Sequence, residues 1–353
     1  MEGSSRMDGA AHGALEGPVL VTGAAGFIGA HLVRELARSP EVEVVALDDL
    51  SGGFRENVPE SVDFVEGSVT DVELVERLFD ERGFRHVYHL AAYAAEGLSH
   101  FIRRFNYTNN VIGSVNLINA AVMHDVECFV FTSSIAVYGA GQVPMREDLV
   151  PSPEDPYGIA KYAVELDLRA AHEMFGLSHV IFRPHNVYGE FQNIGDRYRN
   201  VVGIFMNQIL RGEPLTIFGD GEQQRAFSYV GDIVPLIARS PAVERARNRV
   251  FNVGAERPYT VNELAEAVRE VMGVPDHPIR HLDARNEVMI AYSDHAAAHD
   301  VFGAGEDTGL REGLARMAAW VGEVGSRSTP RFDDIEVERN LPAAWAEPVV
   351  RTS

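Results

Sequence analysis

The sequence predicts an α/β fold in which helices cover both faces of a doubly wound parallel sheet, with a smaller C-terminal α/β lobe. Short apolar runs alternate with longer helical runs through the first half of the chain, which is the pattern of βαβ units. After Pro184 this alternation gives way to a polar region, rich in Asn and Arg, that extends through Asn200. We therefore expect a sheet domain at 18–184, with returns to the sheet near 225–254, and a lobe at 185–324.

The individual elements follow from the same alternation. Short apolar runs predict strands at 18–22, 42–47, 62–65, 86–90, 127–131, 179–183, 215–218 and 250–253. The longer runs between them predict helices at 30–38, 72–82, 106–123, 201–211, 261–272 and 310–320, with a further helix that begins near Pro156. No stretch of the chain repeats, which excludes a solenoid.

The two ends of the chain differ from its middle. Residues 1–17 are polar and rich in small residues, without an apolar signal core, so we expect a disordered extension. Residues 325–353 are polar and contain Pro, and we expect a tail on the surface. No segment is long and apolar enough to span a membrane. We therefore assign no membrane partner and take cytoplasmic residence as the default expectation.

Charge and cysteine content exclude further classes. The chain of 353 residues has a formal net charge of −21, which disfavours nucleic acid and anionic membranes as partners because both would repel it. A small anionic ligand is compatible with this charge, since backbone amides and a few arginines can bind one. The single cysteine, Cys128, lies in an apolar run and is expected in the core. We assign neither a disulfide framework nor a metal site.

The glycine-rich turn has the context of a dinucleotide-binding loop. It spans 23–29 directly after the strand at 18–22, and a helix follows, as a Rossmann-type sheet requires. Gly23 permits the tight turn, Gly26 lets the backbone approach a pyrophosphate, and Gly29 lets helix and strand pack closely. The turn therefore predicts a bound dinucleotide.

Two acids indicate which dinucleotide is bound. Asp48 and Asp49 end the second strand, about 20 residues past the loop, where a carboxylate can accept a hydrogen bond from a ribose 2′-hydroxyl. A 2′-phosphate would meet this negative charge, so NAD is favoured over NADP. Asp48 is also suited to a turn, and the two roles are compatible. Two small residues after the strand at 86–90, Ala91 and Ala92, leave room for the cofactor.

Tyr157 and Lys161 are the candidate catalytic pair. They share one face of the helix that begins at Pro156. A phenol titrates at about pH 10, and the Lys161 ammonium, together with a bound nicotinamide cation, would lower that pKa. Ser134 follows the strand at 127–131, where its hydroxyl can hydrogen-bond a reacting oxygen. The Tyr-x-x-x-Lys spacing alone is usually a solvated helix face, so the assignment depends on the surrounding motifs.

Six motifs occur in order between Pro18 and Trp320. They are Thr22–Gly29, Leu47–Leu50, His89–Ala92, Ser133–Gly139, Tyr157 with Lys161, and Arg183–Gly189. With this set the chain resembles the extended short-chain dehydrogenase/reductase family. Within that family it is similar to the NAD-dependent nucleotide-sugar epimerases and dehydratases of the UDP-glucose 4-epimerase type.

The resemblance implies a set of binding residues. For the cofactor NAD these are Gly23, Gly26, Phe27, Ile28, Gly29, Asp48, Asp49, Ser68, Val69, Leu90, Ala91, Ala92, Asn110, Tyr157 and Lys161. For the nucleotide-sugar substrate they are Ser133, Ser134, Asn186, Asn200, Arg225 and Arg285. Ser68 and Val69 stand where the family usually has an Asp that meets the adenine. Asn109 and Asn110 both interrupt the helical run at 106–123, and asparagine is a poor helix former.

The resemblance also implies a reaction. Tyr157 would remove a proton from a sugar hydroxyl while the sugar carbon gives a hydride to NAD⁺, and the hydride would return to the other face of the keto-sugar. Lys161 would hold the nicotinamide ribose and Ser134 the reacting oxygen. The expected product is the 4-epimer of a UDP-hexose of the glucose/galactose type. The helices from Asn106 and from Tyr157 are expected to pair with those of a second copy in a homodimer.

Two departures bear on the alternatives. Relatives that dehydrate the sugar carry an acid pair where this chain has Ile135 and Ala136, and relatives that epimerise at carbons 3 and 5 carry a cysteine near Ala136. Both activities are therefore disfavoured. The alternatives that stay open are a 4,6- or 5,6-dehydratase, a 3,5-epimerase, a 4-ketoreductase and a non-catalytic NAD-binding protein.

Overall fold

The computed structural model of the chain describes residues 15–284, 288–305, 307–329, 332, 334–342 and 345. Within these residues the centre is a seven-stranded parallel sheet in the order β11-β6-β5-β4-β1-β2-β3. The order reverses between β1 and β4, which confirms the predicted doubly wound α/β fold. The strands are β1 (Gly17–Thr22), β2 (Val42–Asp48), β3 (Asp63–Glu66), β4 (His86–His89), β5 (Cys128–Thr132), β6 (His179–Pro184) and β11 (Arg249–Val253).

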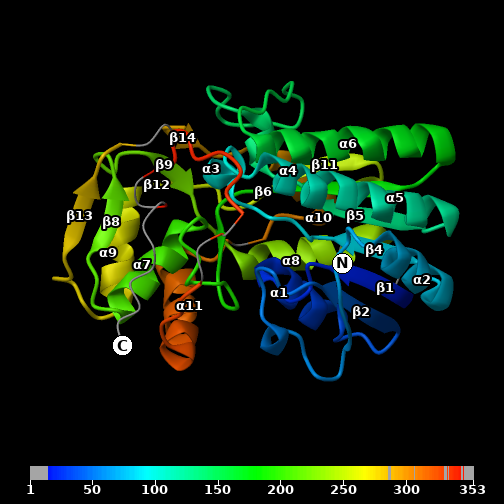
Figure 1. Cartoon of the computed structure of the whole chain (residues 1–353), viewed down its shortest axis with the longest axis horizontal. Coiled ribbons are helices and arrows are strands. Elements are labelled where there is room, and N and C mark those ends of the chain that lie inside the picture. The colour runs from blue at the N-terminus through cyan, green and yellow to red at the C-terminus, as the bar shows by residue number, and fades with distance from the viewer. Residues whose placement is uncertain are drawn as a thin grey trace, which may run out of the picture.

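Helices cover both faces of the sheet (Figure 1). On one face lie α1 (Phe27–Leu36), α8 (Val230–Arg239) and α10 (Ala296–Phe302), and on the other lie α2 (Val72–Arg82), α5 (Gly113–Met123) and α6 (Pro156–Phe175). Successive residues of β1 point to the two sides. Val19 and Val21 belong to the core with α1, whereas Leu20 belongs to the core with α2, α5 and α6. A strand buried on both faces is apolar at every position for this reason.

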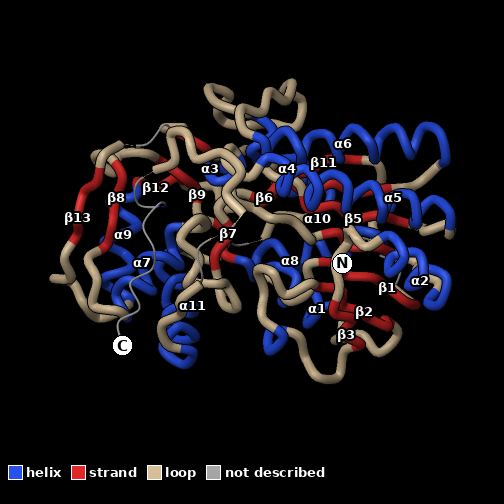
Figure 2. Tube along the Cα trace, viewed as in Figure 1, coloured by secondary structure: helices blue, strands red, loops and turns tan. Residues whose placement is uncertain are grey.

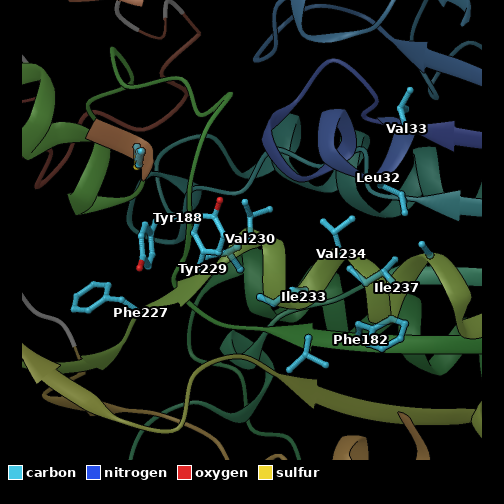
Figure 3. Close-up of a cluster of buried hydrophobic side chains, with 14 of the residues drawn as sticks. Leu32, Val33, Phe182, Tyr188, Phe227, Tyr229, Val230, Ile233, Val234 and Ile237 are labelled. Atoms are coloured by element: carbon cyan, nitrogen blue, oxygen red, sulfur yellow. The ribbon is translucent and has the colours of Figure 1, made fainter. Parts of the chain in front are cut away.

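The core on the α1 side continues into the second lobe (Figure 3). Four apolar residues of α8 face it: Val230, Ile233, Val234 and Ile237. Leu32 of α1 and Phe182 of β6 lie in the same cluster, and so do Tyr188 and Tyr229. Those two tyrosines come from a short strand pair, β7 (Val187–Tyr188) and β10 (Ser228–Tyr229). One hydrophobic core therefore fixes the lobe to the sheet domain.

The second lobe contains two small sheets and three helices among its described residues. The sheets pair β8 (Leu215–Phe218) with β13 (Ile279–Leu282), and β9 (Gln224–Ala226) with β12 (Pro258–Thr260) and β14 (Ile290–Ala291). The helices are α7 (Val201–Leu210), α9 (Val261–Val271) and α11 (Leu310–Val324). Figure 2 shows loops, drawn in tan, gathering between this lobe and the large sheet.

Short helices complete the described chain. They are α3 (Glu96–Ser99) and α4 (Arg103–Tyr107), followed by a π-helical turn at Thr108–Ile112, and 3₁₀ turns at Arg55–Asn57, Ile135–Tyr138, Ser240–Ala242 and Glu244–Ala246. The π turn contains Asn109 and Asn110, at the point where the predicted helix at 106–123 joins α5. Such turns often mark functional positions.

Several boundaries differ from the predictions. α1 begins at Phe27 rather than at residue 30, because Gly26 is already its extended N-cap residue. Gly17 belongs to β1 and Leu15 packs against the core, so the predicted N-terminal extension ends earlier than 17. Residues 1–14 lie outside the described residues. In the predicted surface tail, Trp345 is only 5% exposed. The division of the chain at Pro184 stays a prediction.

Candidate active site

A cavity of about 380 Å³ lies where the parallel strands end. Its wall contains the residues that follow β1, β2, β4, β5 and β6, among them Gly23, Asp49, Leu90, Ser133 and Asn186. This is the edge of an open α/β sheet at which ligands bind, next to the reversal in strand order. The predicted cofactor residues line the cavity with the exception of Asn110.

The glycine loop has the geometry that the sequence predicts. Gly23 has a φ of +68°, and a Cβ there would lie 2.7 Å from the backbone nitrogen of Ala91. A Cβ on Gly29 would lie 2.0 Å from the carbonyl oxygen of Gly23. Side chains at these two positions would force the loop away from β4 or from α1. The backbone can therefore approach a pyrophosphate only with glycine at both.

Asp48 fixes this loop from the neighbouring strand. Its Oδ2 accepts a hydrogen bond from the backbone N–H of Ala25 at 2.9 Å, and its Oδ1 accepts one from Leu50 at 2.8 Å. Burial raises the pKa of the Asp48 carboxyl, and the two backbone donors oppose this. The carboxylates of Asp48 and the exposed Asp49 both lie on the cavity wall. This negative wall suits the ribose hydroxyls of NAD and would repel a 2′-phosphate.

The residues of the expected catalytic set lie together on this wall. Ser134 follows β5, and Tyr157 and Lys161 occupy the first turns of α6. Asp155 starts that helix, accepting a hydrogen bond from the backbone N–H of Gly158 at 2.9 Å, and Pro156 occupies its first position. The Lys161 Nζ donates a hydrogen bond to the carbonyl oxygen of Thr132 at 2.7 Å. α6 thereby presents the phenol and the amine on one face, as predicted from their spacing.

Burial shifts the pKa values of both members of this pair. Burial raises the pKa of the Tyr157 phenol, the Glu96 carboxylate adds to this, and a hydrogen bond with Ser134 opposes it. Burial lowers the pKa of Lys161 to about 7, against the attraction of Glu165. Burial is the largest cause for both groups, and it favours the protonated form of the Tyr157 phenol at neutral pH.

A buried ion pair lies beneath the catalytic residues. Glu165 of α6 contacts the Arg183 guanidinium through both carboxylate oxygens, and it also accepts a hydrogen bond from the Ser133 hydroxyl. Arg183 donates a further hydrogen bond to the Tyr138 hydroxyl at 2.6 Å, and Tyr138 donates to Asn252 at 2.9 Å. Ser133, predicted to bind substrate, lies on the cavity wall but directs its hydroxyl to Glu165. This network joins α6 to β5, β6 and β11.

The predicted substrate residues occupy different positions. Asn186, which has a φ of +41°, and Asn200, the N-cap residue of α7, line the cavity. Arg225 is not among the lining residues, and its guanidinium donates hydrogen bonds to the carbonyl oxygens of Val288 and Met289. Arg285 lies outside the described residues.

Further cavity residues were not assigned from the sequence. Asn109 lines the cavity in place of its neighbour Asn110, whose amide bonds Tyr93 and Asn106 and so ties the loop after β4 to the helix. Arg199 lines it too, with its guanidinium 4.5 Å from the centre of the Tyr93 ring and 3.1 Å from the Asp196 carboxylate. Glu96 and Phe105 complete this side. The Asn-Asn pair was a detectable signal, whereas Arg199 was one of several arginines in a polar region.

Fold and site together define an enzyme that binds a dinucleotide at the sheet edge and places a tyrosine, a serine and a lysine beside it. Residues 19–254 match the model of the NAD dependent epimerase/dehydratase family. The chain belongs to this family. This confirms the family that the sequence motifs predicted. It also confirms NAD as the cofactor.

Individual relatives agree with this family. The chain is 34% identical over 304 residues to UDP-glucose 4-epimerase of Mycolicibacterium smegmatis, covering 84% of this chain and 96% of that one. The structure of UDP-glucose 4-epimerase from Thermotoga maritima with UDP-glucose is 34% identical, with a TM-score of 0.82, over 87% of this chain and 99% of that one. UDP-glucuronic acid 4-epimerase from Bacillus cereus, with UDP-glucuronic acid and NAD, is 27% identical, with a TM-score of 0.79 over 87% and 99%. The chain is an NAD-dependent enzyme of the nucleotide-sugar epimerase type.

No helix in the described ranges has the length and apolar character needed to cross a membrane. No group of three or more His, Cys, Asp or Glu side chains in those ranges is arranged to hold a metal ion.

Proposed function

We propose that the protein interconverts the 4-epimers of a UDP-hexose of the glucose/galactose type, with Tyr157 as the base. The observation that supports this most directly is that Ser134, Tyr157 and Lys161 share one cavity wall, while Ile135 and Ala136 supply no acid beside them. A hydroxyl, a phenol and an amine are what reversible oxidation of a sugar alcohol needs. Relatives of similar identity act on UDP-sugars at the same carbon.

Each side chain has a defined part in this reaction. Ser134 hydrogen-bonds the sugar 4-oxygen, and the Tyr157 phenolate removes its proton. Bound NAD would supply the hydride chemistry at carbon 4, as acceptor and then as donor. Because burial raises the pKa of the Tyr157 phenol, the phenolate requires additional positive charge, which the oxidised nicotinamide and the Lys161 ammonium would supply. Tyr157 then gives the proton back once the 4-keto sugar has turned over in the cavity, so no net oxidation results.

The cofactor assignments are part of this proposal. Gly23, Gly26 and Gly29 would leave space for the pyrophosphate, with Phe27 and Ile28 at the start of α1 beside it. Asp48 and Asp49 would bind the adenosine ribose, and Ser68 and Val69 would lie against the adenine. Asn186, Asn200 and Arg199 would bind the nucleotide diphosphate of the substrate, since arginine clamps phosphates with charge-assisted bonds.

The electrostatics of the wall favour a neutral sugar. Glu96 lines the cavity and is the carboxylate that acts most strongly on Tyr157. A sugar carboxylate placed beside Tyr157 would be repelled by it. This supports UDP-glucose over UDP-glucuronate as the substrate. The same carboxylate is the observation that favours a second candidate, a 4,6-dehydratase, because elimination needs an acidic side chain in the cavity besides the tyrosine.

A product assay separates these candidates. Purified protein loaded with NAD is incubated with UDP-glucose, UDP-N-acetylglucosamine and UDP-glucuronate, and products are identified by mass spectrometry and NMR. We expect the 4-epimer of UDP-glucose at unchanged mass, with no accumulation of NADH. Loss of water would support the dehydratase, and stoichiometric NADH consumption with a 4-keto sugar would support a ketoreductase. Either result would reject the 4-epimerase.

The proposal includes a homodimer. Large apolar side chains are exposed on α5 and α6 and on the turn before α5: Ile112, Met123, Leu166, Met174 and Phe175. Exposed apolar surface on two adjacent helices is typical of an interface, and a second copy would offer the same surface about a two-fold axis. Light scattering at micromolar concentration should give twice the chain mass, and Leu166→Glu should give monomers. Cytoplasmic residence and a role in carbohydrate metabolism stay predictions.

A further inference from the structure

The segment after α11 packs along the outer wall of the cavity. We call the described residues of 325–345 the strap. The match to the T. maritima structure covers 99% of that chain and 87% of this one. In Figure 1 the red portion of the strap runs beside α3. Four contacts fix it there.

The first contact links the second lobe to the cofactor half. The backbone of Arg327 and the side chain of Asn207 on α7 exchange two hydrogen bonds, at 2.9 and 3.0 Å. The Arg327 guanidinium lies 3.9 Å from the centre of the Phe54 ring, which follows cavity residue Gly53. Thr329 donates a hydrogen bond to Asn193, which also lines the cavity. The strap therefore bridges the two sides of the cavity.

The second contact is aromatic. Phe332 packs against Phe105 and Tyr93, with ring centres 4.9 and 5.3 Å apart. Both partners line the cavity, and Tyr93 carries the Arg199 guanidinium over its ring. Aromatic pairs at these separations are favourable beyond the area they bury. Phe332 thus holds the ring on which Arg199 rests.

The third contact is polar and fixes the start of α4. The Glu336 carboxylate accepts hydrogen bonds from the backbone N–H groups of Arg104 and Phe105, each at 2.8 Å. The backbone N–H groups of Glu336 and Val337 donate to the carbonyl oxygen of Phe101. The two bonds to the Glu336 carboxylate satisfy donors that a helix N-terminus otherwise leaves without partners inside the helix. They also place Phe105 at the cavity wall.

The fourth contact reaches the catalytic tyrosine through α3. Trp345 packs edge-on against Phe101 and Tyr198, and a Cβ on Gly97 would lie 3.0 Å from its ring. Gly97 lies in α3, whose last residue, Ser99, accepts a hydrogen bond from the backbone N–H of Tyr157 at 3.3 Å. Trp345 therefore holds the helix that touches the start of α6.

We propose that the strap is a positioning element of the active site, with Phe332 and Trp345 as its positioning residues. It holds Tyr93, α3 and the start of α4 as a fixed wall, and through them it places Arg199 and Tyr157 for the nucleotide sugar. This inference rests on the proposed function of the same cavity. By reciprocity, a ligand that needs this wall stabilises the strap as much as the strap favours the ligand.

The first test uses two variants of the full chain. Phe332→Ala and Trp345→Ala should each raise the KM for UDP-glucose about tenfold, the effect of losing one well-packed aromatic contact. The NAD content should change by less than about twofold in both variants, since neither residue touches the cofactor. The kcat should also stay within about twofold in Phe332→Ala, whereas Trp345→Ala should lower it, because Trp345 holds the helix that contacts Tyr157. Trp345→Phe should keep most of the affinity. Phe84→Ala, which removes a buried aromatic packed on Phe79 far from the cavity, should lower the melting temperature and leave KM unchanged.

The second test needs no variant. Hydrogen exchange of the NAD-loaded wild-type chain is followed in peptides covering 325–329 and 334–342, with and without UDP, whose binding is measured by calorimetry. We expect UDP to slow exchange in both peptides, and Trp345→Ala to abolish this protection. UDP that binds without protecting either peptide would overturn the role of the strap and leave the proposed function intact. Failure to bind UDP at all would reject the proposed function and the strap with it.

Discussion

The two walls of the cavity are built in different ways. The cofactor wall consists of the residues that directly follow β1, β2 and β4, among them Gly23, Asp49 and Leu90, and its shape is set by backbone geometry at Gly23 and Gly29. The other wall consists of Tyr93, Glu96, Phe105 and Arg199, and it depends on contacts between residues far apart in the sequence. Arg199 lies over the Tyr93 ring, and Phe332 packs against Tyr93 and Phe105. A local backbone requirement leaves a motif in the sequence. A wall assembled from distant contacts leaves none.

The largest expected effect comes from removing the hydroxyl of Tyr157, the proposed base. Tyr157→Phe keeps the buried ring but loses the hydroxyl that moves the proton, so we expect kcat to fall about 10³-fold. NAD content should not change, because the glycine loop and Asp48 are untouched. Both are measured on one preparation, by product formation and by cofactor release on denaturation. Tyr162→Phe on the same helix, outside the cavity, should keep full activity. An equal loss of kcat in Tyr157→Phe and Tyr162→Phe would show that Tyr157 is not the base.

The next test concerns the buried ion pair of Glu165 and Arg183. Glu165→Gln leaves the buried Arg183 guanidinium without its counter-charge, and we expect the free energy of unfolding to fall by about 3–5 kcal/mol. Denaturant unfolding measures this. The double variant Glu165→Leu with Arg183→Met removes both charges and should be less destabilised than the single variant. If the double variant loses as much stability as Glu165→Leu and Arg183→Met lose together when measured singly, the two residues are not coupled.

The outcome of the sequence predictions follows the same division. The doubly wound parallel sheet and the glycine loop could be predicted, because a buried parallel strand is apolar throughout and a dinucleotide loop needs glycine at fixed positions. Ser134, Tyr157 and Lys161 could be placed together because strand ends and helix starts meet at one edge of such a sheet. Arg199 could not, since its position depends on Tyr93 and Asp196 rather than on a local pattern. Trp345 lay in a polar tail whose composition gives no sign of its partners.

Protonation was the other property that the spacing did not reveal. Tyr157 and Lys161 share a face as predicted, but burial, which depends on the whole fold, decides their pKa values. Lys161 titrates at about 7 in the folded chain, against 10.5 as its ordinary value. Between these two values the unfolded chain holds a proton that the folded chain has released, so the stability of the NAD-free protein rises with pH in this window.

A pH series can isolate this contribution. The free energy of unfolding is measured for the wild type and for Lys161→Met between about pH 7.5 and 9.5, the range in which only the unfolded lysine is charged. The difference between the two proteins should change by about 1.4 kcal/mol per pH unit, the value for one proton. Relative to the wild type, the variant should be more stable at about pH 7.5 than at about pH 9.5. The wild type must release the Lys161 proton when it folds, and this release costs more free energy at lower pH. A constant difference would mean that Lys161 keeps an ordinary pKa.

The smallest expected effect concerns the wall that the sequence did not reveal. The Glu96 carboxylate raises the pKa of Tyr157, so Glu96→Gln should favour the phenolate and move the acid limb of the kcat/KM profile to lower pH. Glu96 is exposed to solvent, which screens its field, and the gain at neutral pH should be a few-fold at most. Raising the ionic strength should shrink the difference between wild type and variant. Glu81→Gln, an exposed carboxylate on α2 outside the cavity, should leave the profile in place. If both variants move the acid limb equally, the shift reports the overall charge of the protein rather than a carboxylate facing the base. A shift confined to Glu96→Gln would establish that the distant contacts which build this wall also set the acidity of the catalytic tyrosine.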